Sequence, residues 1–294
     1  MHAHKKAVGL LMLTAVLWST GGLLIKWVEW HALAIAGMRS LIAAVFLLGV
    51  LGRPRFTWSG AQIGGGLAYA SCVLCFVAAT KLTTAANAIL LVYTAPIYVA
   101  LLSAWFLQEH VTRLDWLTIA LVMSGMGLFF LDQLTLAGWW GNVCAIAGGM
   151  TMAWTVLCLC KQKDAAALET VLLGNVLAAV IGLPFMFGTL PDLSAWCALA
   201  LAGTVQIGLA FVLYTRAIKA VRAVDAVLIS GIEPMLNPLW VWLLLGEVPG
   251  PWAIIGGTVV VVSVTIRGLL TAHSAPSASQ SAEMCYNQQP NVAP

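Results

Sequence analysis

The chain has 294 residues, of which 61% are hydrophobic and only 9% are charged, and its formal net charge is +3. With a mean hydropathy of +0.95, this composition excludes a soluble globular domain and predicts an integral membrane protein. The few basic residues lie between apolar runs rather than in one patch, so we expect no nucleic-acid partner.

Apolar runs of about 20 residues recur along the chain, a length that suits helices crossing a hydrocarbon core of about 30 Å. Barrel strands would instead alternate over about ten residues, so the predicted fold class is all-α, with ten transmembrane helices. The first run starts with basic residues, as a signal peptide does, but it is too long and lacks a small-x-small cleavage site. We interpret it as a retained helix. The expected spans are 7–27, 32–51, 61–80, 85–107, 114–131, 138–159, 168–187, 195–215, 225–245 and 251–270.

The distribution of Lys and Arg predicts the orientation. If residue 1 is cytoplasmic, eleven basic residues lie inside and three outside, a strong positive-inside bias that places both termini in the cytoplasm. Residues 271–294 are rich in Ser, Ala, Gln and Pro, which predicts a disordered cytoplasmic tail.

One segment of the sequence occurs twice. Residues 86–110 return as residues 224–248 when the numbers are shifted by 138, and the shift aligns Ala88 with Ala226, Pro96 with Pro234, and Glu109 with Glu247. We therefore predict two five-helix repeats, residues 1–135 and 136–270. Because five is odd, the second repeat enters the membrane with inverted orientation, an arrangement that permits alternating access.

A proline in the middle of a membrane helix frees a carbonyl four residues earlier, here those of Val92 and Ser230. Polar backbone at mid-membrane in both repeats indicates a transporter binding site.

The landmarks Trp18, Arg39, Pro96 with Glu109, and Pro234 with Glu247 together resemble the drug/metabolite transporter superfamily, in its EamA-type ten-helix branch. The family's helix-end Leu-Gly-Glu is intact at residues 245–247 but reads Leu107-Gln108-Glu109 in the first repeat. With thirteen tryptophans, the chain looks most like the bacterial aromatic amino acid exporters. The resemblance implies a secondary transporter of the bacterial inner membrane.

Polar and aromatic side chains share stripes of the predicted helices and could line a cavity for a substrate with an apolar body and polar ends. The alternative is that the polar groups join helices by hydrogen bonds and the aromatic rings belong to the core or the interfacial belt. The substrate-binding candidates are Trp18, Phe76, Thr94, Tyr98, Trp154, Ser230, Glu233 and Asn237. Further possible lining residues are Tyr69, Tyr93, Tyr214, Phe211 and Gln206.

Glu233 is the most informative acid, because it lies about 12 Å into its predicted span. It could bind a substrate ammonium or take up a proton, since intramembrane carboxylates are expensive and usually functional. Alternatively, it could pair with Arg39, to which we assign a structural or gating role. Pro96, Glu109, Pro234 and Glu247 are also interpreted as structural or gating residues.

The sequence predicts no metal site and no cofactor. All five histidines lie at ends or in loops, and the cysteines show no framework spacing. Cys72 and Cys75 form a CxxC, but it lies on a continuous predicted helix with no second pair, so we interpret the cysteines as small core residues. No Walker A, GxSxG or HExxH motif is present, so we expect no enzyme.

The leading prediction is therefore a secondary transporter that exports small amphipathic metabolites, with aromatic amino acids preferred. The partners are then a small-molecule substrate and the lipid bilayer. An exporter of cationic drugs, using Glu233 for proton coupling, is the alternative from the same class. A channel or a membrane-embedded lipid-modifying enzyme is the alternative from another class. Proton coupling and oligomeric state are left open.

Overall fold

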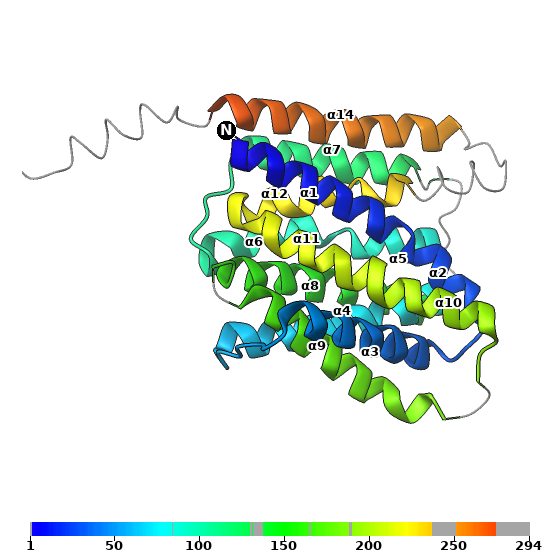
Figure 1. Ribbon diagram of the computed structural model, residues 1–294. Coiled ribbons are helices and arrows are strands. Elements are labelled where there is room, and N and C mark those ends of the chain that lie inside the picture. The colour runs from blue at the N-terminus through cyan, green and yellow to red at the C-terminus, as the bar shows by residue number, and fades with distance from the viewer. Residues whose placement is uncertain are drawn as a thin grey trace, which may run out of the picture.

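The computed structural model describes residues 2–83, 85–129, 131, 138–164, 166–187, 190–236 and 251–274, and its regular secondary structure there is helical throughout. Figure 1 shows the helices side by side in one bundle. The first half contains α1 (His2–Ser19), α2 (Gly21–Trp27), α3 (Ala32–Leu51), α4 (Gly60–Leu82), α5 (Ala85–Val92), α6 (Ala95–Phe106) and α7 (Arg113–Phe129).

The second half begins with α8 (Trp139–Lys161), α9 (Ala167–Gly182) and the short 3-10 helix η2 (Leu183–Phe185). It continues through α10 (Leu193–Leu201), the π-helix η3 (Ala202–Leu209), α11 (Ala210–Ala217) and the 3-10 helix η4 (Ile218–Ala220). It ends with α12 (Ala223–Ser230), a helical turn at residues 233–236, and α14 (Pro251–Ser274).

The predicted all-α membrane fold is confirmed. Seven helical segments of the described chain are long and apolar enough to cross a membrane, and residues 251–267 form a shorter apolar helix. Helix lies within each of the ten predicted spans, the ninth being described only as far as Leu236. The number of ten membrane crossings stays a prediction.

Near the two ends of the chain, helix boundaries differ from the sequence-based expectation. The first predicted span is interrupted at Thr20, where α1 gives way to α2. Consecutive glycines follow this point, and glycine weakens a helix. At the other end of the chain, α14 continues to Ser274, four residues into the predicted tail, because helix-disfavouring Pro276 comes only later. The rest of the predicted tail, residues 275–294, lies outside the described residues.

Glycine pairs bring helices of the two halves together. A Cβ atom added to Gly37 of α3 would lie only 2.8 Å from the Cα of Gly182 in α9. Gly125 of α7 similarly faces α14, where an added Cβ would lie 3.0 Å from the carbonyl oxygen of Gly256. Without the hydrophobic effect to drive association, such close backbone approach is how membrane helices gain packing energy.

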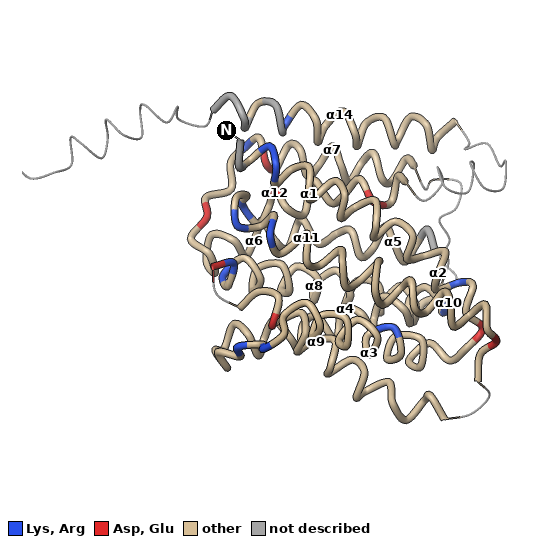
Figure 2. Tube along the Cα trace, in the orientation of Figure 1, with Lys and Arg blue, Asp and Glu red and all other residues tan. Residues whose placement is uncertain are grey.

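Charges and apolar side chains are distributed as a membrane protein requires. Large apolar side chains such as Val45, Leu101, Val180 and Ile254 are exposed on the outside of the bundle, where lipid can cover them. Figure 2 shows that most Lys and Arg gather at the end of the bundle where the chain begins.

The connection after α6 contains a strained residue. Gln108, at the position where the family motif has glycine, is exposed and has a φ of 57°. Glycine adopts this left-handed conformation without penalty. We predict that Gln108→Gly raises stability by about 1 kcal/mol, measured as an increase in the Tm of the purified protein.

Gln108→Ala is the control for that substitution. It removes the same side-chain atoms but keeps the Cβ, so it should leave the Tm unchanged or lower it. An equal increase for both variants would show that backbone strain is not the cause.

Candidate functional site

Two helices are broken at equivalent positions of the two halves. α5 ends at Val92 and α6 begins at Ala95, so Tyr93 and Thr94 form a turn. α12 ends at Ser230 and helix resumes at residue 233, so the turn there is residues 231–232. Both turns follow the same shift of 138 that relates the two sequence segments.

The prolines begin new helices rather than kinking continuous ones. Pro96 is the second residue of α6, and Pro234 is the second residue of the helical turn at 233–236. A proline is tolerated in a first helical turn, where its missing N–H has no partner to lose. The expectation of one continuous fourth span over residues 85–107 is therefore corrected to two shorter helices joined by a turn.

The two breaks meet through one tyrosine. The hydroxyl of Tyr93, from the first break, donates to the carboxylate of Glu233 in the second break. The same hydroxyl lies 3.5 Å from the carbonyl oxygen of Ser230, the carbonyl expected to be freed by Pro234. Tyr93 is only 3% exposed. The side chain of one half thus satisfies polar groups that the helix break of the other half leaves open.

A cavity of about 120 Å³ lies beside this contact. Its walls are mostly apolar and aromatic, and both halves of the chain contribute to them. The lining residues are Trp18, Arg39, Tyr69, Cys72, Val73, Phe76, Val92, Tyr93, Met152, Thr155, Val156, Leu159, Gln206, Ile207, Phe211, Tyr214 and Glu233. An apolar cavity with a few convergent polar groups is the usual form of a small-molecule site.

Aromatic rings form one wall. The ring of Trp18 lies 5.1 Å from that of Phe211 and 5.3 Å from that of Tyr214, between ring centroids. Phe211 also meets the ring of Tyr69 edge-on at 5.1 Å. These contacts hold the rings as a fixed apolar surface for a flat or aliphatic ligand.

Several polar atoms of the wall have no protein partner within the described chain. They are Nε and Nη1 of Arg39, Oε1 of Gln206 and the hydroxyl of Tyr214. By contrast, the hydroxyl of Tyr69 donates to Oδ1 of Asn175 at 3.4 Å. Buried polar groups without partners are costly, so this cavity is suited to a ligand that supplies the missing partners.

The structure brings some of the predicted site residues together and leaves others apart. Trp18, Phe76 and Glu233 line the cavity, and so does Arg39. The further candidates Tyr69, Tyr93, Gln206, Phe211 and Tyr214 also line it. Asn237 and Glu247 lie outside the described residues.

Four candidates lie away from the cavity wall. The hydroxyl of Thr94 donates to the carbonyl of Leu91 in the preceding turn, at 2.7 Å. Trp154 packs its ring against Phe106, with 4.9 Å between centroids. Tyr98 and Ser230 are likewise absent from the lining, and the hydroxyl of Ser230 is buried.

Sequence reasoning missed Cys72 and Met152. Cys72 belongs to a helical stripe of α4 with Tyr69 and Phe76, at spacings of three and four, and this periodicity could have identified it. Gln206 and Phe211 are five residues apart, a spacing that a regular α-helix would place on different faces. The π-helix η3 lies between α10 and α11 and accounts for their common wall.

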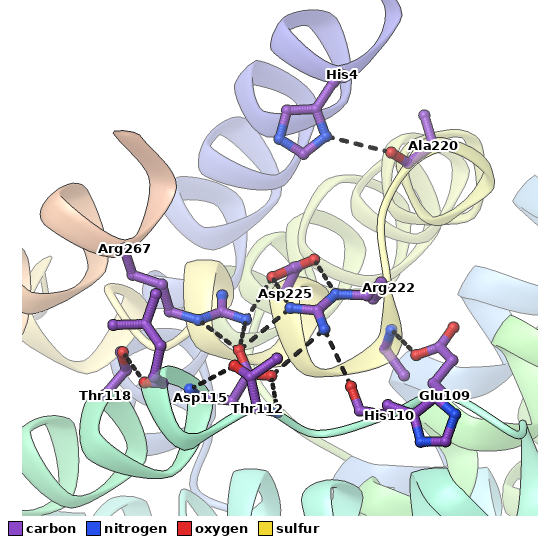
Figure 3. Close-up of polar contacts among 12 residues, drawn as sticks. His4, Glu109, His110, Thr112, Asp115, Thr118, Ala220, Arg222, Asp225 and Arg267 are labelled. Carbon is purple, nitrogen blue, oxygen red and sulfur yellow. Dashed lines mark hydrogen bonds and ion pairs between the residues drawn. The ribbon is translucent and has the colours of Figure 1, made fainter. Parts of the chain in front are cut away.

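A cluster of charges lies at another place, where α7, α12 and α14 come together (Figure 3). Arg267 contacts the carboxylates of both Asp115 and Asp225, at 2.6 Å each. Arg222 contacts the same two carboxylates at 3.2 and 3.1 Å. Burial lowers the pKa of Arg222, but its bonds to Asp225 and Asp115 outweigh this effect and raise the pKa above the ordinary value.

Glu109 lies near this charge cluster and contacts the start of α12. Its carboxylate accepts a hydrogen bond from the backbone N–H of Ala223, the first residue of α12, at 3.1 Å. An acidic group is favourable at a helix N-terminus. Glu109 therefore links the end of the fourth predicted span to the start of the ninth (Figure 3).

A metal centre finds no support in the part of the chain that the structure describes. No group of three or more His, Cys, Asp or Glu side chains there is placed to hold a metal ion.

The proteins and the family model that match this sequence are described as transporters or exporters. A family model described as the EamA-like transporter family matches residues 5–131 and again residues 139–268. An uncharacterised transporter of Archaeoglobus fulgidus is 28% identical over 264 residues, covering 87% of this chain and 94% of the relative. The pseudopaline exporter CntI of Pseudomonas aeruginosa is 26% identical over 206 residues, covering 67% of this chain and 71% of the relative.

The fold also matches a solved protein crystal structure. It superposes with a TM-score of 0.78 over 93% of this chain and 100% of the other chain, at 18% sequence identity. At that identity the likeness concerns the fold alone.

Loss of the contact between the two helix breaks should lower the stability of the protein. Tyr93→Phe removes a hydrogen bond to a half-buried carboxylate, so we predict a loss of about 1.5–3 kcal/mol, measured as a lower Tm. Tyr214→Phe is a matched control, because its hydroxyl is equally buried but has no partner. Its Tm should be unchanged or higher. A similar fall for both variants would contradict the assigned contact.

The charge cluster yields a second stability prediction. Arg267→Met removes the buried partner of two carboxylates and should cost about 3 kcal/mol or more, seen as a fall in Tm. Arg216→Met, at an exposed site, is the control and should change the Tm little. If the two variants unfold at the same temperature, the cluster does not hold these helices together.

Proposed function

The chain belongs to the EamA-like transporter family, and we propose that it exports small amphipathic metabolites, with aromatic amino acids as preferred substrates, by alternating access. It is a multi-pass membrane protein. No enzymatic step and no cofactor is needed for this function. The observation that carries the proposal is the composition of the central cavity, where an acidic group lies among aromatic rings at the meeting point of two broken helices.

Within the cavity the groups suit different parts of such a substrate. Glu233 can meet the ammonium group, and the carboxylate can exchange Tyr93 for the substrate as its hydrogen-bond partner. Trp18, Phe76 and Phe211 can pack against the apolar part. We also propose that Asn237, outside the described residues, meets the polar end.

Two observations support inverted repeats as the basis of alternating access. The family model matches the chain twice, once in each half. The helix contacts also keep their pattern when the halves are exchanged. Contacts α3 to α9 and α7 to α14 map onto themselves, while α4 to α8 exchanges with α1 to α11. Such a pattern is expected from a pseudo-two-fold axis, about which the repeats could rock.

The proposed location is the inner membrane of a bacterium, with both termini in the cytoplasm. The gathering of Lys and Arg at the end where the chain begins supports this orientation. In that case the charge cluster around Asp115 and Arg267 lies on the cytoplasmic side.

Proton-coupled export of cationic drugs is the second candidate, favoured by one observation. Glu233 is a carboxylate inside the bundle. Among the described residues it accepts a hydrogen bond from the neutral hydroxyl of Tyr93 and forms no ion pair with a cation. Such a group could exchange a proton for a cationic substrate.

Flux into proteoliposomes distinguishes the candidates. We predict saturable flux of radiolabelled phenylalanine, weaker flux of threonine and little of ethidium. Glu233→Gln should reduce phenylalanine flux about tenfold, which corresponds to about 1.4 kcal/mol of lost interaction. Glu29→Gln, at an exposed acid, is the control and should retain full flux. Movement of ethidium alone, abolished in Glu233→Gln, would establish the drug exporter instead.

A further inference from the structure

Arg39 is a buried cation in the wall of the cavity. It lies in α3 and is only 3% exposed, and its Nε and Nη1 atoms are buried without a hydrogen-bond partner. Arginine cannot be deprotonated under ordinary conditions, so the guanidinium carries its charge into this site. An isolated buried charge is strongly unfavourable unless an anion compensates it.

The described chain supplies no such anion. Its ion pairs involve Arg222 and Arg267, and none includes Arg39. Glu233 lines the same cavity but is not within ion-pair distance of Arg39, and it is bonded to Tyr93. The sequence-based alternative, in which Arg39 is the structural partner of Glu233, therefore has no support in this conformation.

The backbone around Arg39 is held firmly. Gly37 packs against Gly182 of α9, and a Cβ atom added to Gly203 of η3 would lie 2.8 Å from the carbonyl oxygen of Arg39. Close packing on two sides fixes the backbone from which the Arg39 side chain extends. The fold therefore determines that this side chain lies at the cavity wall.

We propose that Arg39 is the carboxylate-binding residue of the transport site, so that the protein selects zwitterionic substrates over purely cationic ones. The proposal rests on the proposed function and assigns Arg39 a binding role in place of the structural or gating role expected from the sequence. The planar guanidinium can hold a carboxylate through two parallel hydrogen bonds. Arg39 then binds the carboxylate of the substrate, and Glu233 binds its ammonium group.

The two charged residues are placed for this division. Arg39 and Glu233 line the same cavity, and Cys72 lines it with them, so the two charged groups border one space. Because they stay apart, each charge is free for a ligand. A cation without a carboxylate would leave the Arg39 charge uncompensated and add a second positive charge to the same cavity.

The test compares phenylalanine with two analogues in proteoliposome flux. Phenylalaninamide keeps the ammonium but lacks the carboxylate, and 3-phenylpropionate keeps the carboxylate but lacks the ammonium. For the wild type we expect phenylalanine flux at least about tenfold above that of the amide, the gain that one good charged contact gives. Arg39→Gln should lower phenylalanine flux about tenfold and raise amide flux, because the positive charge that disfavours the amide is removed. Arg39→Lys, which keeps the charge without the fork, should give an intermediate value.

A binding measurement separates failure of this inference from failure of the proposed function. 3-Phenylpropionate should raise the Tm of the wild type but not of Arg39→Gln, whether or not either protein transports amino acids. The Tm of ligand-free Arg39→Gln also shows whether this variant folds; since it removes an unpaired buried charge, we expect no fall.

Each outcome of these measurements tests the role of Arg39, the proposed transport function, or both. Equal flux of phenylalanine and its amide in the wild type would overturn the role of Arg39 while leaving the transport function intact. Absence of all flux, with the Tm shift present and dependent on Arg39, would overturn aromatic amino acid export and keep the anion site. Absence of both would overturn both. If Arg39→Gln does not fold, the wild-type flux ratio decides alone.

Discussion

The structure depends on one constraint, that a polar backbone group inside a bilayer must find a partner within the protein. Two helix breaks would be unfavourable if they faced lipid. Here they face each other, and the hydroxyl of Tyr93 from one break serves Glu233 and the carbonyl of Ser230 in the other. The breaks thereby fix where the cavity lies, because both halves of the chain must meet at that point.

Charge is used in two different ways along the bundle. At one end, Arg222 and Arg267 are neutralised by Asp115 and Asp225, and this cluster joins three helices. In the cavity, the guanidinium of Arg39 is left without a protein anion in the described chain. The first arrangement stabilises a closed contact between helices, whereas the second keeps a charge available for a ligand. The separation of roles follows from burial and pairing rather than from residue type.

The sequence predicted much of this architecture and less of the site. Hydropathy identified the helical segments, and the 138-residue shift located both breaks, because apolar length and proline position are local properties. That Pro96 starts a new helix, and that Trp154 and Tyr98 lie away from the cavity, depends on how helices rotate against one another. The π-helix η3 likewise turns Gln206 and Phe211 toward one wall, and no residue in it signals the wider turn. Packing between distant segments decides such details.

The central claim is that the substrate binds where the two broken helices meet, between Arg39 and Glu233. A crystal structure of the protein with phenylalanine bound tests it most directly. The account predicts the ligand in the cavity, with its carboxylate at the guanidinium of Arg39, its amino group at the carboxylate of Glu233, and its ring against Trp18 and Phe211. Phenylalanine bound elsewhere in the bundle, or bound in the cavity with the opposite polarity, would contradict the account.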